Sequence, residues 1–212
     1  MVTKQLFSLS ALSLFSFASL LHADYINGTV WSVPASTAGS TPVAGSAPGA
    51  GATELATFSA NGIDFSGDGP GAYNIGGFLA SNGVASNITY MNGATAASDL
   101  NNTLWEFTGS ATFTNGETFN VVHDDGVNMY VNGTAVLLDP GPTAPVTSTF
   151  TYTGATGTFN FDFIYTECCG GTADFSTTIV PNAPSAPEPP SGLLYAAAGL
   201  ALSGLRWLGR RK

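Results

Sequence analysis

The sequence has very few basic residues, and none of them lies between Asp24 and Glu188. Its five lysine and arginine residues are confined to the two ends, all fourteen aspartate and glutamate residues lie within this segment, and the formal net charge is −9. Nucleic-acid binding requires basic side chains, and bidentate recognition of an anionic substrate requires arginine, so both are excluded for this segment. Repulsion among its carboxylates can be reduced by hydrogen bonds, by wide spacing on a soluble surface or by a divalent cation.

Enzymatic signals are also absent. The segment has one histidine, His123, and no Gly-x-Ser-x-Gly elbow, zinc-binding histidine pair or phosphate-binding loop. These patterns position nucleophiles, metals and phosphates in common enzyme classes. We therefore expect a protein that is not an enzyme. Two carboxylates at a suitable separation remain the one arrangement that could hydrolyse a glycosidic bond.

The first residues are typical of an export signal. Residues 1–23 contain one formally charged residue, Lys4, then the run LFSLSALSLFSFASLL, and end on the small residue Ala23. A basic start, an apolar centre and a small residue at the cleavage point are the three parts of a secretory signal peptide. We expect cleavage just before Asp24.

Residues 187–212 combine a Pro-Glu-Pro motif, an apolar run from Leu193 to Leu205 and a basic cluster at the chain end. The motif and the cluster consist of Pro187, Glu188, Pro189, Arg206, Arg210, Arg211 and Lys212. Crossing a bilayer as a helix takes about 20 apolar residues, so the run predicts a short transmembrane helix. The basic end is expected on the cytoplasmic side, with everything upstream facing outward.

In combination with the signal peptide, this segment resembles the PEP-CTERM sorting signal of exported bacterial proteins. The resemblance implies recognition by an exosortase, cleavage near the Pro-Glu-Pro motif and release to the cell envelope or the extracellular matrix. Membrane anchoring is then transient. An ordinary C-terminal anchor behind a proline-rich linker is the alternative.

Between the two ends, residues 24–181 are expected to form one domain, because roughly 160 residues are enough to bury a single core. Residues 34–53, PASTAGSTPVAGSAPGAGAT, are a low-complexity stretch that cannot bury enough apolar surface to fold independently. They are predicted to form a long loop after a first strand at 25–33. Residues 182–190 are a proline-rich linker.

The domain is predicted to be an all-β, antiparallel β-sandwich. Asn-Gly pairs, which favour hairpin turns because both residues tolerate positive φ, begin at Asn27, Asn61, Asn82, Asn92, Asn115 and Asn132. Alternating aromatic residues over 159–166 are typical of a half-buried strand. Further strands are expected at 104–107, 129–131 and 150–152. No helical periodicity is evident, and the aromatic residues are assigned to a core between two sheets.

One segment combines residues that suit metal chemistry. Within FNVVHDDGVNMYVNG, residues 119–133, the strand pattern breaks at Asp124-Asp125. Adjacent carboxylates repel unless a cation or several hydrogen-bond donors are supplied, and hard oxygen ligands in a loop suit calcium. A second loop, over 167–172, follows the later aromatic strand. We expect the two loops to meet at one end of the sandwich.

The succession from Trp105 to Phe175 is similar to the protective-antigen-type β-sandwich shared by bacterial toxins, glycosidase inserts and yeast flocculins. The resemblance implies a calcium site that coordinates sugar hydroxyls, with Asp124 and Asp125 as ligands and residues 167–172 as the second loop. The hypothesis assigns Glu167 to the metal as well. It places His123, Gly126, Asn128, Cys168, Cys169, Gly170 and Gly171 in the loops around the ligand.

Two alternatives stay open at this site. The paired aspartates can bind calcium and an extracellular polysaccharide, or they can only brace the turn of a structural matrix protein. Cys168 and Cys169 are the only cysteines. An oxidising compartment favours a disulfide between them, with intermolecular crosslinks or two free thiols as the other outcomes.

Overall fold

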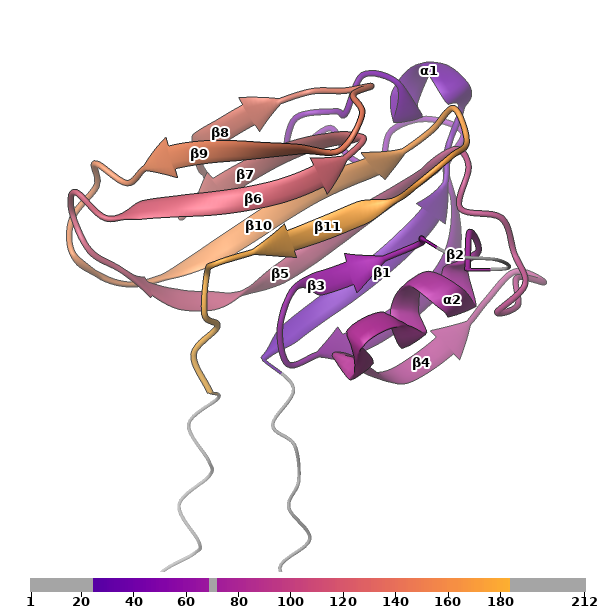
Figure 1. The fold of residues 1–212 in the computed structure, drawn as a ribbon, viewed down its shortest axis with the longest axis horizontal. Coiled ribbons are helices and arrows are strands. Elements are labelled where there is room, and N and C mark those ends of the chain that lie inside the picture. The colour runs from indigo at the N-terminus through magenta and orange to yellow at the C-terminus, as the bar shows by residue number, and fades with distance from the viewer. Residues whose placement is uncertain (1–24, 69–71, 184–212) are drawn as a thin grey trace, which may run out of the picture.

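Two antiparallel sheets face each other in this computed structural model, which describes residues 25–68 and 72–183 (Figure 1). The larger sheet runs in the order β4 (Ala85–Tyr90), β2 (Thr53–Ala60), β1 (Ile26–Ser32), β5 (Thr103–Phe113), β10 (Gly157–Glu167), β7 (Gly126–Val131) and β8 (Thr134–Asp139). The smaller sheet runs in the order β3 (Asp64–Ser66), β11 (Asp174–Thr177), β6 (Thr118–Asp124) and β9 (Val146–Thr151). The expected all-β antiparallel sandwich is confirmed.

The predicted signal peptide and the predicted sorting segment, residues 187–212, lie outside the described residues. Across residues 25–68 and 72–183, the structure contains no helix with the length and apolar character needed to span a membrane. The predicted transmembrane helix over 193–205 therefore stays a prediction.

Aromatic side chains fill the space between the sheets, as the alternating pattern predicted. Phe161, Phe163 and Tyr165 of β10 are at most 2% exposed, because alternate residues of a strand point to the same face. The ring of Tyr165 stacks on Phe175 of β11 at a centroid distance of 4.8 Å, which joins the two sheets. Burial of each such side chain contributes about 2 kcal/mol. The aromatic core is thus the main stabilising feature of the sandwich.

Short helices were not expected from the sequence. They are α1 (Ala35–Ala38), α2 (Ile75–Ala80) and the 3₁₀ turn Ser81–Gly83. The side chain of Asn74 caps α2 by accepting a hydrogen bond from the Gly77 amide at 2.8 Å. Phe78 of α2 packs between the sheets, where its ring centroid lies 4.9 Å from that of Trp105 and 5.4 Å from that of Phe65. A helix of six residues is too short to produce a visible periodicity, which is why no helical pattern is evident in the sequence at this segment.

The Asn-Gly pairs predicted hairpins more often than the structure forms them. The pair at Asn132 does join two paired strands, β7 and β8, with positive φ at both residues. In contrast, Asn27 lies inside β1, and the turn at Asn115 connects β5 to β6, which belong to different sheets. The pairs at Asn61, Asn82 and Asn92 do not connect paired strands either. The dipeptide reports local backbone conformation and not the sheet that the next strand joins.

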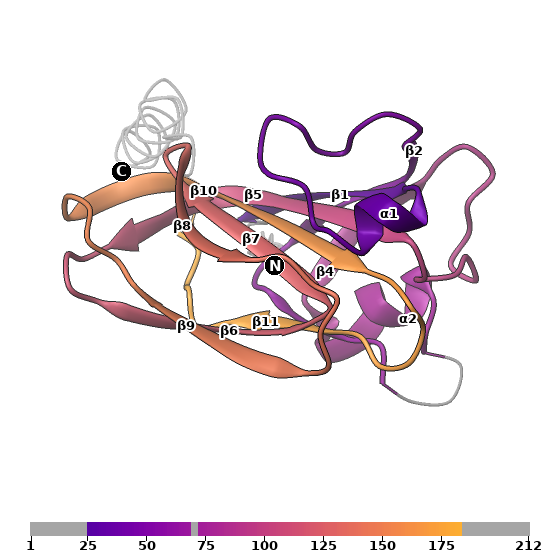
Figure 2. The ribbon, with the colours of Figure 1, turned by 90° about the horizontal axis from the view of Figure 1, so that it is seen from above.

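The low-complexity stretch 34–53 lies on the face of the seven-stranded sheet turned away from the four-stranded sheet, hereafter the outer face (Figure 2). Its Ala38 packs in a small apolar cluster with Leu104 and Ile164 of the sheet. Its Thr41 hydroxyl lies 2.6 Å from that of Thr166, and the Asn128 amide donates to the Thr41 carbonyl at 2.8 Å. The predicted loop thus includes the short helix α1, and its last residue, Thr53, begins β2. Side chains of the sheet hold the stretch in place.

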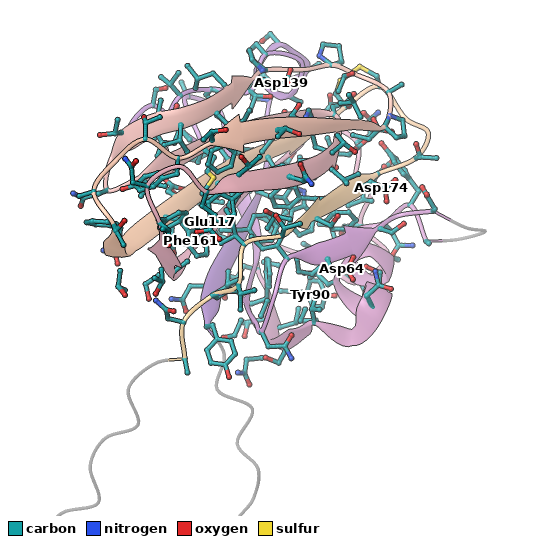
Figure 3. The ribbon with its side chains drawn as sticks, turned by 60° about the vertical axis from the view of Figure 1, so that its left-hand side comes forward. Asp64, Tyr90, Glu117, Asp139, Phe161 and Asp174 are labelled. Carbon is teal, nitrogen blue, oxygen red and sulfur yellow. A yellow bond between two sulfur atoms is a disulfide. The ribbon has the colours of Figure 1, made fainter. Side chains whose placement is uncertain are left out.

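Carboxylates outside the site described below are spread over the surface. Glu117, in the turn before β6, and Asp139 of β8 lie apart from Asp64 and Asp174 (Figure 3). Asp64 and Asp174 belong to the paired strands β3 and β11. Burial raises the pKa of Asp174, and the charges of Asp68 and Asp64 add to the rise. Wide spacing in water weakens their mutual repulsion. Separation therefore relieves only part of the negative charge of the domain.

Candidate functional site

The Asp124-Asp125 pair lies where the chain crosses from one sheet to the other. β6 of the four-stranded sheet ends at Asp124 and β7 of the seven-stranded sheet begins at Gly126. The peptide bond between the two aspartates is cis. A Cβ atom at Gly126 would lie 2.1 Å from the Thr41 hydroxyl and 2.2 Å from the Gly141 nitrogen. Gly126 is therefore required for the close approach of two other segments to this crossing.

The Asp125 side chain connects the loop after β8 to the loop after β10. One carboxylate oxygen accepts a hydrogen bond from the Thr143 amide at 3.1 Å, and the other accepts one from the Cys168 amide at 2.7 Å. Asp124 accepts a hydrogen bond from the Thr172 hydroxyl at 2.6 Å. The loops after β6 and after β10 thus meet at one end of the sandwich, as the sequence predicted.

Glu167 lies beneath the two aspartates and is 1% exposed. Its carboxylate accepts hydrogen bonds from the hydroxyls of Tyr73 at 2.7 Å and Tyr165 at 2.9 Å. Each of Asp124, Asp125 and Glu167 offers an oxygen within 4.8 Å of the others. Three acidic side chains therefore converge, and the sequence has no lysine or arginine between Asp24 and Glu188 to neutralise them.

The electrostatics of this group favour protonation when no cation is bound. Burial raises the pKa of Glu167 to about 8, while the two tyrosine hydrogen bonds oppose the rise and the neighbouring aspartates add to it. Burial also raises the pKa of Asp125, against the effect of the two backbone amides. Oxygen ligands of this kind are those that calcium takes, so the residues present fit that ion.

An open depression of about 420 Å³ lies above the paired aspartates. Asp124 and Asp125 line it together with loop residues that follow β8 and β10: Pro142, Thr143, Ala144, Pro145, Gly170, Gly171 and Thr172. Most of this lining is backbone and small side chains. A ligand seated there would reach the two carboxylates without displacing a bulky residue.

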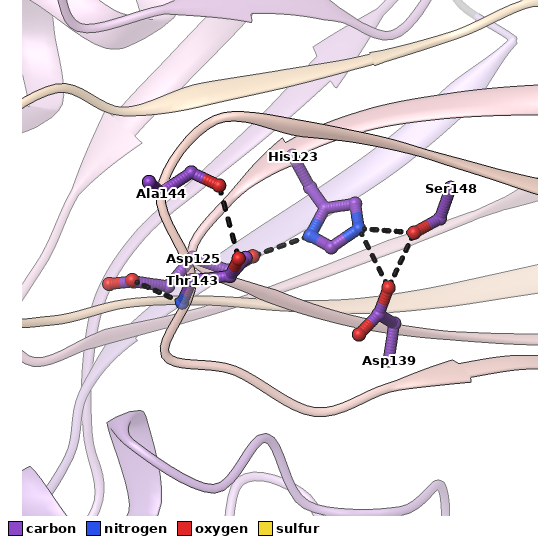
Figure 4. Close-up of polar contacts among 6 residues, drawn as sticks. All are labelled: His123, Asp125, Asp139, Thr143, Ala144 and Ser148. Carbon is purple, nitrogen blue, oxygen red and sulfur yellow. Dashed lines mark hydrogen bonds and ion pairs between the residues drawn. The ribbon is translucent and has the colours of Figure 1, made fainter.

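His123 is buried and contacts the backbone of the Asp124-Asp125 loop (Figure 4). Its Nδ1 donates to the Asp125 carbonyl, because a carbonyl oxygen can only accept. Its Nε2 lies 2.9 Å from the Ser148 hydroxyl and 3.3 Å from the Asp139 carboxylate. Serine, histidine and aspartate also form hydrolytic triads. In a triad, the serine contacts one ring nitrogen of the histidine and the carboxylate contacts the other. Here both side chains contact the same nitrogen.

The residues expected around the ligand separate into two groups. Gly170 and Gly171 line the depression beside the aspartates. His123 is fully buried, and Asn128 faces the other way, where its amide holds the 34–53 stretch. These two lie behind the depression because strands β6 and β7 direct their side chains away from it.

Cys168 and Cys169 form a vicinal disulfide. Cys168 is 3% exposed and packs in the small apolar cluster on the outer face, while Cys169 is exposed. The backbone amide of Cys168, not its sulfur, contacts Asp125. The disulfide therefore constrains the two residues that follow β10, the first of which presents this amide.

Four residues of the site were not singled out from the sequence. Thr143 lies in a proline-rich turn, Thr172 at the end of the second loop, and Tyr165 within a strand pattern. Tyr73 comes from the segment before α2, 94 residues from its partner Glu167 in the chain. A threonine in a loop that is expected to hold a ligand can be picked out from the sequence. The pairing of Tyr73 with Glu167 leaves no pattern in the sequence that would predict it.

Neither a protein-family model nor a curated protein matches this chain. Several solved structures are similar to it, including the following three. A PA14 sugar-binding domain from an RTX adhesin shows 24% identity and a TM-score of 0.46, over 73% of this chain and 88% of that one. The PA14 domain of the antifreeze protein MpAFP shows 20% identity and a TM-score of 0.46, over 76% and 84%. An anti-sigma factor domain-containing protein shows 14% identity and a TM-score of 0.47, over 78% and 50%.

Proposed function

We propose that this domain binds calcium at Asp124 and Asp125 and uses the bound ion to hold a carbohydrate in the depression above them. The observation that carries the proposal is the convergence of three carboxylates, with oxygens within 4.8 Å of one another, at the floor of an open depression. Repulsion among these groups disfavours their charged forms in the absence of a cation. The proposed function is binding, without catalysis.

The donor set suits calcium better than a softer metal. Calcium takes six to eight oxygen ligands, typically from carboxylates, carbonyls, water or ligand hydroxyls. Asp124 and Asp125 would hold the ion, and Glu167 would contribute negative charge from beneath. These few carboxylates leave coordination positions for oxygens from outside the protein, and vicinal hydroxyls of a sugar are suitable donors.

We propose that this binding takes place outside the cell, on the strength of the two segments predicted at the chain ends. The predicted signal peptide and the predicted sorting segment support a protein that is exported, anchored briefly in the membrane and processed by an exosortase. Its final location would be the cell envelope or extracellular matrix, where polysaccharide is the available partner. Fractionation of cells that express the intact chain and a variant lacking 187–212 tests this part. An identical distribution of the two would remove the sorting proposal.

The calcium proposal is tested by thermal unfolding in calcium, in magnesium and in chelator at matched ionic strength. A ligand that binds only the folded state raises stability by RT ln(1 + [L]/Kd), so calcium at about 100 times Kd should add about 2.7 kcal/mol. Asp124→Asn should abolish this rise. Asp68→Asn is the matched control, because it removes one charge from an exposed residue outside the site.

Glycan binding is measured on the same proteins. Retention on a glycan array should require calcium and disappear in Asp124→Asn but not in Asp68→Asn. Calcium-dependent stabilisation without glycan retention would leave a structural calcium site. Equal unfolding temperatures in calcium and chelator would remove both parts of the proposal.

A structural role without any ligand is the second candidate, and one observation favours it. Both carboxylate oxygens of Asp125 already accept hydrogen bonds from backbone amides. Such bonds alone can hold two loops at the end of a sandwich. In this case, Asp125→Asn would lower stability equally with calcium and with chelator.

A further inference from the structure

A row of four polar side chains crosses the outer face of the seven-stranded sheet. Asn27 of β1 pairs with Thr108 of β5, which pairs with Asp162 of β10, which in turn pairs with Tyr130 of β7. Residues directly opposite each other in a sheet present their side chains on the same face. Neighbouring strands lie about 4.8 Å apart, so the row is about 14 Å long.

This row forms part of a groove of about 550 Å³, which we call the outer groove. It is lined by Tyr25, Asn27, Ala44, Thr108, Gly109, Ser110, Tyr130, Gly133, Asn160, Phe161, Asp162 and Asn182. Ala44 belongs to the low-complexity stretch, and Gly133 to the turn between β7 and β8. The groove is thus bounded by a loop that the sheet itself holds in place.

Two polar atoms of the groove are buried without a hydrogen-bond partner. Tyr130 is 7% exposed, and within the described part of the chain its hydroxyl oxygen has no partner. The same holds for Oδ1 of Asp162, the residue directly opposite it across the strands. Buried polar atoms are normally paired, and unpaired ones disfavour the folded state. A ligand that supplies hydrogen-bond donors would remove this penalty.

The charge of the groove restricts the ligand. Burial raises the pKa of Asp162 to about 6, and the nearby Glu106 carboxylate adds to the rise. No lysine or arginine is available between Asp24 and Glu188 to attract an anion. The amides of Asn27, Asn160 and Asn182 offer both donors and acceptors. These groups suit an uncharged ligand with many hydroxyls.

We infer that the outer groove is a second binding site, and that it takes a neutral carbohydrate chain. The Asp162 carboxylate and the Tyr130 hydroxyl accept hydrogen bonds from sugar hydroxyls, while Asn27 and Thr108 extend the contact across β5 to β1. This site is separate from the calcium site. Asp162 and Glu167 are five residues apart on β10, which is roughly 17 Å along a strand. Binding in the outer groove requires no metal.

The test uses the protein in chelator with a panel of soluble neutral oligosaccharides of glucose, mannose, galactose and N-acetylglucosamine. Isothermal titration calorimetry should detect binding of at least one member. Tyr130→Phe should weaken that binding at least tenfold, since it removes only the unpartnered hydroxyl that would accept a hydrogen bond from the sugar. Asp162→Asn should weaken it similarly, whereas Asp68→Asn and Asp124→Asn should leave it unchanged.

Circular dichroism checks that each variant is folded. Tyr130→Phe loses no hydrogen bond within the described residues, so it is expected to fold even if Asp162→Asn does not. The inference is overturned if no oligosaccharide of the panel binds, or if Tyr130→Phe binds as tightly as the parent. Binding that needs calcium and is lost in Asp124→Asn would also overturn it, because the carbohydrate would then occupy the calcium site.

Discussion

The Asp124-Asp125 loop and the outer groove both hold carboxylates in a domain without lysine or arginine, but they differ in how the oxygens are partnered. In the loop, Asp125 accepts two backbone amides and Glu167 accepts two tyrosine hydroxyls. In the groove, one oxygen of Asp162 and the hydroxyl of Tyr130 have no partner among the described residues.

This difference separates two uses of a buried polar group. Hydrogen bonds donated to Asp125 connect the loops after β8 and β10, so its carboxylate has a structural task whether or not a cation binds. Among the described residues, Oδ1 of Asp162 has no hydrogen-bond partner, and this unpaired oxygen lowers stability instead. Stability measurements should therefore distinguish the regions as clearly as binding measurements do.

The largest effect is expected from Asp125→Ala. It leaves the amides of Thr143 and Cys168 without their acceptor, and each lost partner for a buried donor costs about 1–3 kcal/mol. Because the Thr143 amide is only partly buried, its share is at the low end, and a total loss of about 2–4 kcal/mol should appear in urea unfolding in chelator. A loss equal to that of Asp68→Asn would mean that Asp125 does not brace the loops.

The next effect is a pH dependence that arises from Glu167 in the metal-free protein. Its pKa is about 8 in the folded state, against an ordinary value of 4.5, so between these values the folded state holds a proton that the unfolded state has lost. Stability is therefore highest at low pH and decreases as pH rises through about 8. From pH 6 to 8 the decrease is about 2–3 kcal/mol, at about 1.4 kcal/mol per pH unit.

Glu167→Gln is the control for that pH dependence. It keeps the shape of the side chain and removes its titration, so urea unfolding in chelator should show a smaller decrease between pH 6 and 8. The same slope in both proteins would assign the pH dependence to other groups.

A smaller effect is expected where the low-complexity stretch meets the sheet. Asn128→Ala removes hydrogen bonds to the carbonyls of Thr41 and Pro42, at 2.8 and 3.2 Å, and should cost about 1–2 kcal/mol. Limited proteolysis should then cut within 34–53 faster than in the parent. Unchanged cleavage would show that the apolar cluster around Ala38 holds the stretch by itself.

The smallest effect on stability is expected in the outer groove. Tyr130→Phe removes a buried hydroxyl that has no partner, so the unfolding free energy should change by less than about 0.5 kcal/mol or increase slightly. A loss of more than about 1 kcal/mol would indicate that the hydroxyl is satisfied in the folded protein, for example by bound water, and the contrast between the two regions would disappear.

Strand positions were largely predictable because alternation is a local property. The aromatic residues over 159–166 predicted β10, and the run after Tyr25 predicted β1. Sheet membership was not predictable in the same way. The turn at Asn115 looks like any hairpin turn, yet it sends the chain from one sheet to the other. Such pairing depends on residues far apart in the sequence.

Prediction of the site followed the same division. Asp124 and Asp125 stand out because adjacent acidic residues interrupt a strand pattern. The loop from Glu167 to Thr172 stands out because it follows the alternating aromatic strand β10. Their convergence was expected and is seen. Tyr73 could not be anticipated, because it reaches Glu167 from a segment without any motif.

The sequence by itself determined the acidic, lysine- and arginine-free composition of the domain, the alternating strands and the residues at the candidate metal loop, since each depends on neighbours in the chain. Only the tertiary structure decided that the low-complexity stretch is held by Asn128, and that Asn27, Thr108, Asp162 and Tyr130 form one row. That row arises from the register of four strands that are distant in sequence. Register is set by the packing of the shared core, which no single segment specifies.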